Sequence, residues 1–133
     1  MGEQFHMFKK IMIVDDDPDI LIYLRTVFER QHYEVLTVDS GNDCIRELER
    51  GFKGIVLMDL IMPFMDGWET LREMVKKGLT KDVVISIITA NQTPNQQEMK
   101  EFHKYIHNFI PKPFDLERLI SEIHSITTSK KIN

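Results

Sequence analysis

Apolar runs and amphipathic stretches alternate along the chain, and this alternation predicts a repeated order of strand followed by helix. In the stretches between the runs, apolar side chains recur at helical spacing, which is typical of helices that pack one face onto a sheet. The run at 83–88 is almost continuously apolar, as expected for a strand that helices cover on both faces. The predicted strands are 11–14, 34–38, 54–58, 83–88 and 105–110.

Capping signals indicate where the helices begin. Asp17-Pro18 combines a capping side chain with proline at the first helical position, and Thr93-Pro94-Asn95-Gln96 has the spacing of a capping box. Ser40 is a further candidate cap, for a helix that Gly51 ends. The last helix is expected to begin near Asp115, and the polar tail 127–133 is expected to be frayed.

Five strand–helix units without a linker predict one α/β domain, a doubly wound, five-stranded parallel sheet in three layers (α/β/α). Seventeen Lys and Arg against 21 Asp and Glu give a formal charge of −4, which argues against nucleic acid as a partner. No apolar stretch reaches the roughly 18 residues of a membrane span. The first residues lack the features of a secretion signal, and the single cysteine fits a reducing compartment, so we expect a cytoplasmic location.

Carboxylates follow two of the predicted strands at the point where each strand ends. Asp15 and Asp16 come directly after 11–14, and Asp59 follows 54–58. The carboxyl ends of parallel strands meet at one edge of the sheet, so these side chains are expected to converge, together with Thr89 and Lys112. Crowded carboxylates repel one another unless a cation joins them. The pattern therefore predicts a divalent-metal pocket in which one aspartate can take part in chemistry.

Four short motifs lie at the predicted strand ends: Val14-Asp15-Asp16, Asp59-Leu60-Ile61-Met62-Pro63-Phe64-Met65-Asp66-Gly67, Ile88-Thr89-Ala90 and Lys112-Pro113-Phe114. Together they resemble the receiver domain of bacterial and archaeal response regulators, over about residues 8–127. Residues 1–7 and 128–133 are then expected to be tails. The resemblance implies a CheY-like, flavodoxin-like sheet in the order 2-1-3-4-5. It also implies a regulatory protein, not an enzyme, that accepts a phosphoryl group on Asp59 from the phosphohistidine of a kinase.

The resemblance implies a role for each site residue. Mg²⁺, with Mn²⁺ or Ca²⁺ as substitutes, is expected on Asp16, on Asp59 and, through water, on Asp15. The main-chain carbonyl of Ile61 is expected to complete the protein ligands. A carboxylate can act as the nucleophile in such a transfer. Two residues are expected to act on the phosphoryl group, Lys112 as a positive charge and Thr89 as a hydroxyl donor. Thr89 and the aromatic Phe109, which swings inward, are expected to switch in response to it. The peptide before Pro113 is expected to be cis.

Partners follow from the same resemblance. A sensor histidine kinase or a histidine phosphotransfer protein is expected upstream, and an unidentified protein downstream, with neither nucleic acid nor a membrane contacted directly. The expected partner surface, which could also pair two copies, combines the fourth helix, the fifth strand and the fifth helix. The segment 105–108 lacks the small residues usual in the family, and the helix at 96–104 is unusually polar. Apolar Ile61 predicts slow self-dephosphorylation, which Asn91 could partly offset.

Other interpretations of the acidic residues were weighed. Asp17 is interpreted as a helix cap and not as a metal ligand, and Asp66-Gly67 as a turn pair only. Asp15 and Asp17 have the spacing of the haloacid-dehalogenase phosphatases, whose first aspartate is the nucleophile, although the chain has no length for a cap domain. A third possibility is an interaction module that keeps the fold without phosphorylation.

Overall fold

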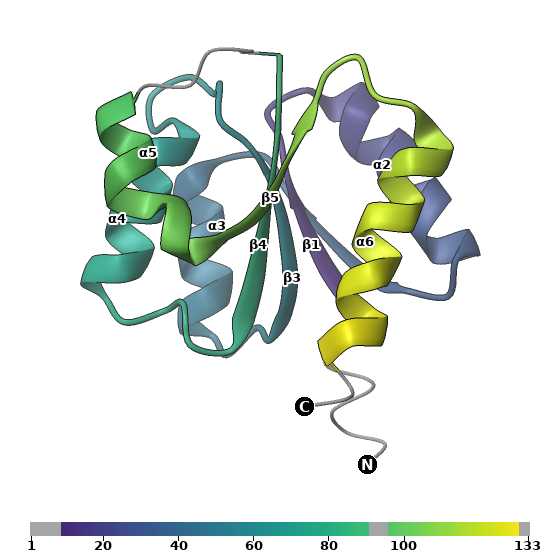
Figure 1. Ribbon diagram of the computed structural model, residues 1–133, viewed down its shortest axis with the longest axis horizontal. Coiled ribbons are helices and arrows are strands. Elements are labelled where there is room, and N and C mark those ends of the chain that lie inside the picture. Colours follow the sequence, from purple (N-terminus) through teal and green to yellow (C-terminus); the bar gives the residue numbers. More distant parts are fainter. Residues whose placement is uncertain (1–8, 91–95, 131–133) are drawn as a thin grey trace.

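The computed structural model describes residues 9–90 and 96–130, in which strands and helices alternate (Figure 1). The strands are β1 (Lys10–Val14), β2 (Glu34–Val38), β3 (Gly54–Asp59), β4 (Val83–Thr89) and β5 (Ile106–Pro111). The helices are α2 (Pro18–Arg30), α3 (Gly41–Glu49), α4 (Gly67–Lys76), α5 (Gln96–Phe102), the 3₁₀ turn η1 (His103–Tyr105) and α6 (Leu116–Lys130).

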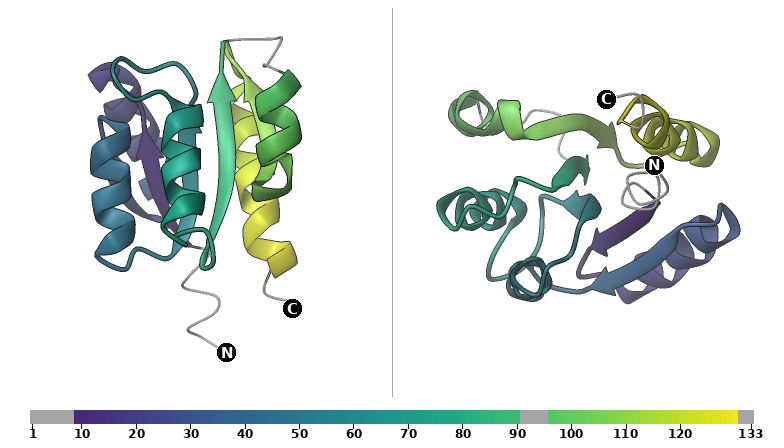
Figure 2. Two further views of the ribbon diagram at one scale, coloured as in Figure 1. Left: turned by 90° about the vertical axis from the view of Figure 1, so that its left-hand side faces the viewer. Right: turned by 90° about the horizontal axis from the view of Figure 1, so that it is seen from below.

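The five strands form one parallel sheet in the order β2-β1-β3-β4-β5, so the predicted fold is confirmed. Val14 lies opposite Met58, and Thr89 lies opposite Pro111. The strand arrows end at the same edge of the sheet (Figure 2). The residues that directly follow β1, β3, β4 and β5 are therefore neighbours in space although they are far apart in the sequence.

Helices cover both faces of the sheet, with α3, α4 and α5 on one face and α2 and α6 on the other (Figures 1 and 2). Each face has its own core. The first contains Val56 and Ile87 from the sheet and Trp68 from α4. The second contains Leu57 and Ile88, packed against helices that contribute apolar side chains at helical spacing. Strands buried on both faces explain the continuous apolar runs in the sequence.

Side-chain caps begin the first helices, as predicted. Asp17 accepts a hydrogen bond from the main-chain N–H of Asp19 at 2.9 Å, and Ser40 accepts one from Asp43 at 3.1 Å. Gly51, just beyond α3, has φ of 104°, a conformation that glycine adopts without strain. The cap predicted at Thr93 lies outside the described residues, as does the tail predicted at 1–7.

The prediction that a frayed tail begins at residue 127 is wrong. The last helix, α6, continues to Lys130. Thr127 is buried, and its Oγ1 lies 3.1 Å from the hydroxyl oxygen of Tyr33. A polar side chain that looked solvated in the sequence is thus satisfied by a partner far away in the chain. No helix in the described part of the chain is long and apolar enough to cross a membrane.

Candidate functional site

Three carboxylates meet at the carboxyl edge of the sheet, from the two central strands β1 and β3. One oxygen of each of Asp15, Asp16 and Asp59 lies within 4.8 Å of the others, and within the described residues this is the acidic group suited to a metal ion. Asp15 is 2% exposed and Asp59 6% exposed, whereas Asp16 faces solvent. Carboxylate oxygens are the ligands that Mg²⁺ prefers, so this donor set fits the predicted metal.

Lys112 joins the two buried carboxylates. Its Nζ lies 3.1 Å from Oδ2 of Asp15 and 3.1 Å from Oδ2 of Asp59. The main-chain N–H of Lys112 donates to the carbonyl of Thr89 at 2.9 Å, and the Lys112–Pro113 peptide is cis, as expected. The lysine therefore reaches the site from the end of β5, across the end of β4.

The second oxygen of each buried carboxylate is fixed by the main chain. Asp15 Oδ1 accepts from the N–H of Asp17 at 2.9 Å, and Asp59 Oδ1 accepts from the N–H of Ile61 at 3.0 Å. Each carboxylate thus has one oxygen on a backbone donor and one on the Lys112 ammonium. Side chains held in this way are oriented before any ligand arrives.

Burial and charge act in opposite directions within this cluster. Burial raises the pKa of Asp15, although the N–H of Asp17 and the Lys112 ammonium favour its charged form and only partly offset the rise. Burial alone would lower the pKa of Lys112, but hydrogen bonds and charge from Asp15 and Asp59 raise it overall. The cluster therefore holds more negative charge than its single ammonium stabilises, which favours a further cation.

Thr89 and Phe109 lie on the neighbouring strands β4 and β5. Thr89 ends β4 and is 4% exposed. Phe109 in β5 is half-buried, and its ring centroid lies 6.5 Å from that of Trp68 in α4. The Trp68 ring also stacks on Phe102 at 6.2 Å. The aromatic group Trp68, Phe102 and Phe109 thus links β5 to α4 and α5.

The sequence interpretation of Asp66-Gly67 as a turn pair was incomplete. Asp66 caps α4 through a reciprocal pair of hydrogen bonds with Glu69, and the Asp-x-x-Glu spacing was a signal that could have shown it. A Cβ on Gly67 would lie 2.7 Å from Leu60 Cα and 2.8 Å from the carbonyl oxygen of Asp59. Glycine therefore lets α4 begin directly against the end of β3, where Asp59 stands.

Two other residues singled out in the sequence, Asp17 and Ile61, lie outside the group of three carboxylates and Lys112. Asp17 caps α2 and is not part of the carboxylate group, in keeping with its interpretation as a cap. Ile61, two residues after Asp59, is 57% exposed and lies at the rim of the site. Asn91 lies outside the described residues.

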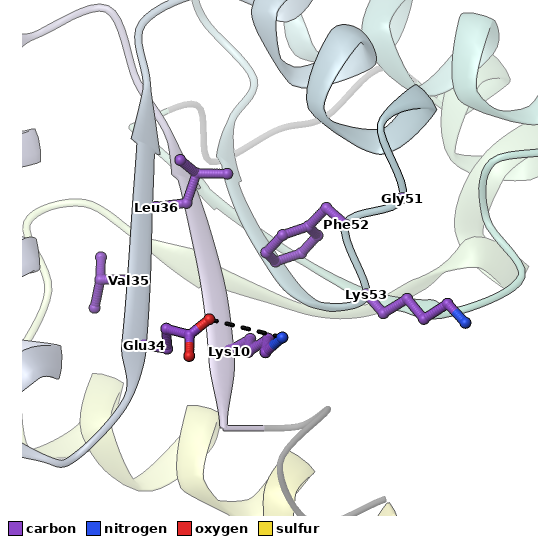
Figure 3. Close-up of a pocket in the computed structure, with 7 residues that line it drawn as sticks. All are labelled: Lys10, Glu34, Val35, Leu36, Gly51, Phe52 and Lys53. Atoms are coloured by element: carbon purple, nitrogen blue, oxygen red, sulfur yellow. Dashed lines mark ion pairs between the residues drawn. The ribbon is translucent and has the colours of Figure 1, made fainter. Parts of the chain in front are cut away.

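A hollow of about 360 Å³ lies at the opposite edge of the sheet, where β1 and β2 begin (Figure 3). Lys10 and Glu34 on its wall form an ion pair at 3.7 Å, and Lys53 pairs with Asp82 at 4.0 Å. The Phe52 ring points into the hollow, whereas the Lys53 side chain extends away from it. The hollow is not the site that the sequence predicts, because it lies at the opposite edge of the sheet and its lining contains none of the predicted site residues.

Comparison with known proteins identifies the kind of site. A sequence model of the response regulator receiver domain matches residues 11–124. The protein PilH of Pseudomonas aeruginosa is 29% identical over 119 residues, which cover 88% of this chain and 96% of PilH. Other curated relatives are longer, and the chain spans 53% of the heme response regulator HssR of Staphylococcus aureus.

Solved structures give the same result. A CheY-like receiver domain from Methanospirillum hungatei JF-1 has a TM-score of 0.86 and 35% identity, with 93% of this chain and 98% of that chain covered. The response regulator TrrA of Thermotoga maritima, solved in complex with Mg²⁺ and BeF, has a TM-score of 0.75 and 25% identity, with coverages of 89% and 98%. With its sheet order, its edge of carboxylates and its matching motifs, the chain belongs to the response regulator receiver domain family of two-component signalling.

Proposed function

We propose that the protein accepts a phosphoryl group on Asp59 from the phosphohistidine of a histidine kinase or histidine phosphotransfer protein. The observation that carries the proposal is the meeting of Asp59 with Asp15, Asp16 and the Lys112 ammonium within one small cluster. In the transfer, an oxygen of Asp59 attacks phosphorus and forms the P–O bond. The P–N bond to the donor histidine breaks, and its electron pair stays on the imidazole nitrogen.

Mg²⁺ would be held by Asp16 and Asp59, with Asp15 acting through water and the carbonyl of Ile61 completing the protein ligands. When bound, Mg²⁺ supplies positive charge that allows an anionic carboxylate to approach an anionic phosphoryl group. The TrrA neighbour was solved with Mg²⁺ and BeF, and the acidic group of this chain lies on the same fold. Mn²⁺ and Ca²⁺ are hard cations with similar ligands and would substitute in binding.

Lys112 and Thr89 would receive the transferred group. The Lys112 ammonium already contacts Asp59 Oδ2 and would move to a phosphoryl oxygen as negative charge arrives there. Thr89, at the end of the adjacent β4, would donate its hydroxyl to a second phosphoryl oxygen. These contacts differ between the modified and unmodified protein, so they are able to shift a conformational balance.

The conformational response would run from Thr89 to Phe109 and from there to the partner surface. Phe109 lies one strand away from Thr89, and its ring contacts Trp68. Movement of Phe109 would alter the packing beneath α5, β5 and α6, the surface expected to bind a downstream protein or a second copy. Receiver domains act as regulators within two-component systems, and we propose the same role here, in the cytoplasm.

A phosphatase of the haloacid-dehalogenase type would use Asp15 as nucleophile and Asp17 as acid. In this fold Asp17 caps α2 and Asp15 pairs with Lys112, an arrangement that favours the receiver reaction over the phosphatase reaction. Borohydride reduction after treatment with acetyl phosphate and Mg²⁺, followed by peptide mapping, discriminates between the two reactions. Reduction at residue 59 supports the receiver, and reduction at residue 15 would show the phosphatase. Absence of Mg²⁺ binding and of any labelling would instead indicate an interaction module.

A further inference from the structure

Charge is distributed unevenly over the molecule, although the net charge is modest. The segments 15–19, 39–43, 59–69, 89–90 and 111–117 run from the strand ends toward the first turns of the helices, and Lys112 is the one basic residue within them. Its ammonium is already engaged with Asp15 and Asp59. The carboxyl edge of the sheet is therefore an acidic face. Its exposed members in the described residues include Asp16, Asp17, Asp19, Asp39, Glu69 and Asp115.

An exposed aromatic residue stands on this face, in the loop between β3 and α4. Phe64 is 101% exposed, so the fold gives its ring no cover. Its φ is 67°, in the left-handed region that bulky side chains rarely adopt. Glycine or asparagine would satisfy this turn with less strain. The fold itself therefore gives no reason for a phenylalanine here, neither in packing nor in backbone conformation.

The position of this loop relative to Asp59 supplies a reason. The loop follows Asp59, which is 6% exposed, so a phosphoryl donor must come close to the strand ends to reach it. A donor carried by a protein would cover the rim of the site, including Ile61, which is 57% exposed, and Phe64. Aromatic side chains that enter a recess on the partner commonly dominate the affinity of an interface.

We propose that Phe64 is the anchor by which this protein docks on its phosphohistidine-bearing partner. The partner carries lysine and arginine around the histidine and an apolar recess for the Phe64 ring. Basic charge on the partner complements the acidic face and speeds encounter. A second copy of this chain is a poor occupant, because a two-fold contact would set acidic face against acidic face. This inference rests on the proposed function and names the partner's chemistry.

Two donors separate docking from chemistry. Acetyl phosphate reaches Asp59 without docking. The second donor is a purified, autophosphorylated histidine-kinase core, chosen from a panel as the fastest donor to the wild type. Transfer from this core requires docking. Phe64→Asn removes the ring and tolerates a positive φ, whereas Phe64→Tyr keeps the ring. For Phe64→Asn we expect a loss of about tenfold or more in transfer from the kinase core, as for loss of an aromatic hot spot, and labelling by acetyl phosphate within about twofold of wild type. Phe64→Tyr retains both rates.

Salt provides a second readout. Raising the ionic strength should slow transfer from the kinase core to the wild type, because complementary charges are screened. Equal transfer to Phe64→Asn and wild type overturns the proposal, and so does a panel in which no core labels the wild type faster than acetyl phosphate. A dimer that dissociates on Phe64→Asn, seen by sedimentation, would assign the ring to self-association instead. If acetyl phosphate fails to label Asp59, the proposed function fails, which is a separate outcome.

Discussion

Lys112 Nζ lies 3.1 Å from Oδ2 of Asp15 and 3.1 Å from Oδ2 of Asp59, so one ammonium connects the ends of β1, β3 and β5. In the protein without metal, this lysine is the cation that lets two buried carboxylates coexist. A bound divalent cation would share that task and leave the lysine able to follow the phosphoryl group. The same side chain would thus stabilise the fold before phosphorylation and bind the phosphoryl group afterwards.

Replacement of the lysine should therefore have a metal-dependent effect on stability. In EDTA, Lys112→Met is expected to lower the free energy of unfolding by about 1–3 kcal/mol, because both carboxylates lose their partner in a largely buried site. Saturating Mg²⁺ should narrow the difference in unfolding free energy between Lys112→Met and the wild type. Urea denaturation with and without Mg²⁺ measures it. Lys77→Met, which removes the exposed pair with Glu49 at 3.2 Å, is the control and should cost under about 1 kcal/mol. A loss no larger than that of the control would contradict the account.

The raised pKa of Asp15 predicts a pH dependence in the metal-free protein. A carboxyl group whose pKa is higher in the folded than in the unfolded state contributes stability at low pH, and the contribution is lost as the pH rises through the folded-state pKa. Asp15→Asn has no carboxyl group at this position and so does not lose stability in this way as the pH rises. Without metal it should therefore be more stable than the wild type at pH 7, and the difference in stability should shrink toward pH 4. Thermal denaturation across this range tests the sign, and Mg²⁺ should remove the advantage. The raised pKa of Lys112 adds no change in this window, because its contribution is lost only at strongly alkaline pH.

The single tryptophan offers a direct view of the switch. Trp68 lies 6.5 Å from Phe109 between ring centroids, so a movement of Phe109 should change the Trp68 emission. Acetyl phosphate with Mg²⁺ should produce this change in the wild type. In Thr89→Ala the label at Asp59 should persist, while most of the fluorescence change disappears. A full fluorescence response in Thr89→Ala would show that the threonine does not couple the two events.

Gly67 should be intolerant of a side chain for a reason that concerns the site. Gly67→Ala places a Cβ 2.7 Å from Leu60 Cα, and relief of the overlap should cost about 1–3 kcal/mol of unfolding free energy. Because the neighbouring carbonyl belongs to Asp59, labelling by acetyl phosphate should slow as well. Gly78→Ala is the matched control, since Gly78 has φ of 69° and nothing within 4 Å of an added Cβ. It should lose stability through backbone strain yet label at the wild-type rate.

Hydrophobic periodicity and strand-end chemistry were sufficient to predict the architecture. A parallel sheet brings all strand ends to one edge, so the convergence of Asp15 with Asp59 follows from topology once the strands are assigned. The caps at Asp17 and Ser40 were predictable because capping depends on residues close in the sequence.

Features that depend on distant residues were not predictable in the same way. Thr127 looked like a solvated tail residue, but it is buried in α6 beside the Tyr33 hydroxyl, far away in the chain. The close approach of Gly67 to the end of β3 is likewise a packing relation that no local spacing encodes. The position of Lys112 after β5 was predicted, but its contacts with both carboxylates were not, because they depend on how the side chain crosses the end of β4.

The central claim is that Asp59 accepts phosphorus with the help of a divalent cation. Intact-mass measurement after incubation with acetyl phosphate tests it most directly, on wild type with Mg²⁺, on wild type with EDTA, and on Asp59→Asn with Mg²⁺. We expect a gain of one phosphoryl group in the first sample and none in the other two. A phosphoryl gain on Asp59→Asn, or an unmodified wild type in the presence of Mg²⁺, would contradict the account.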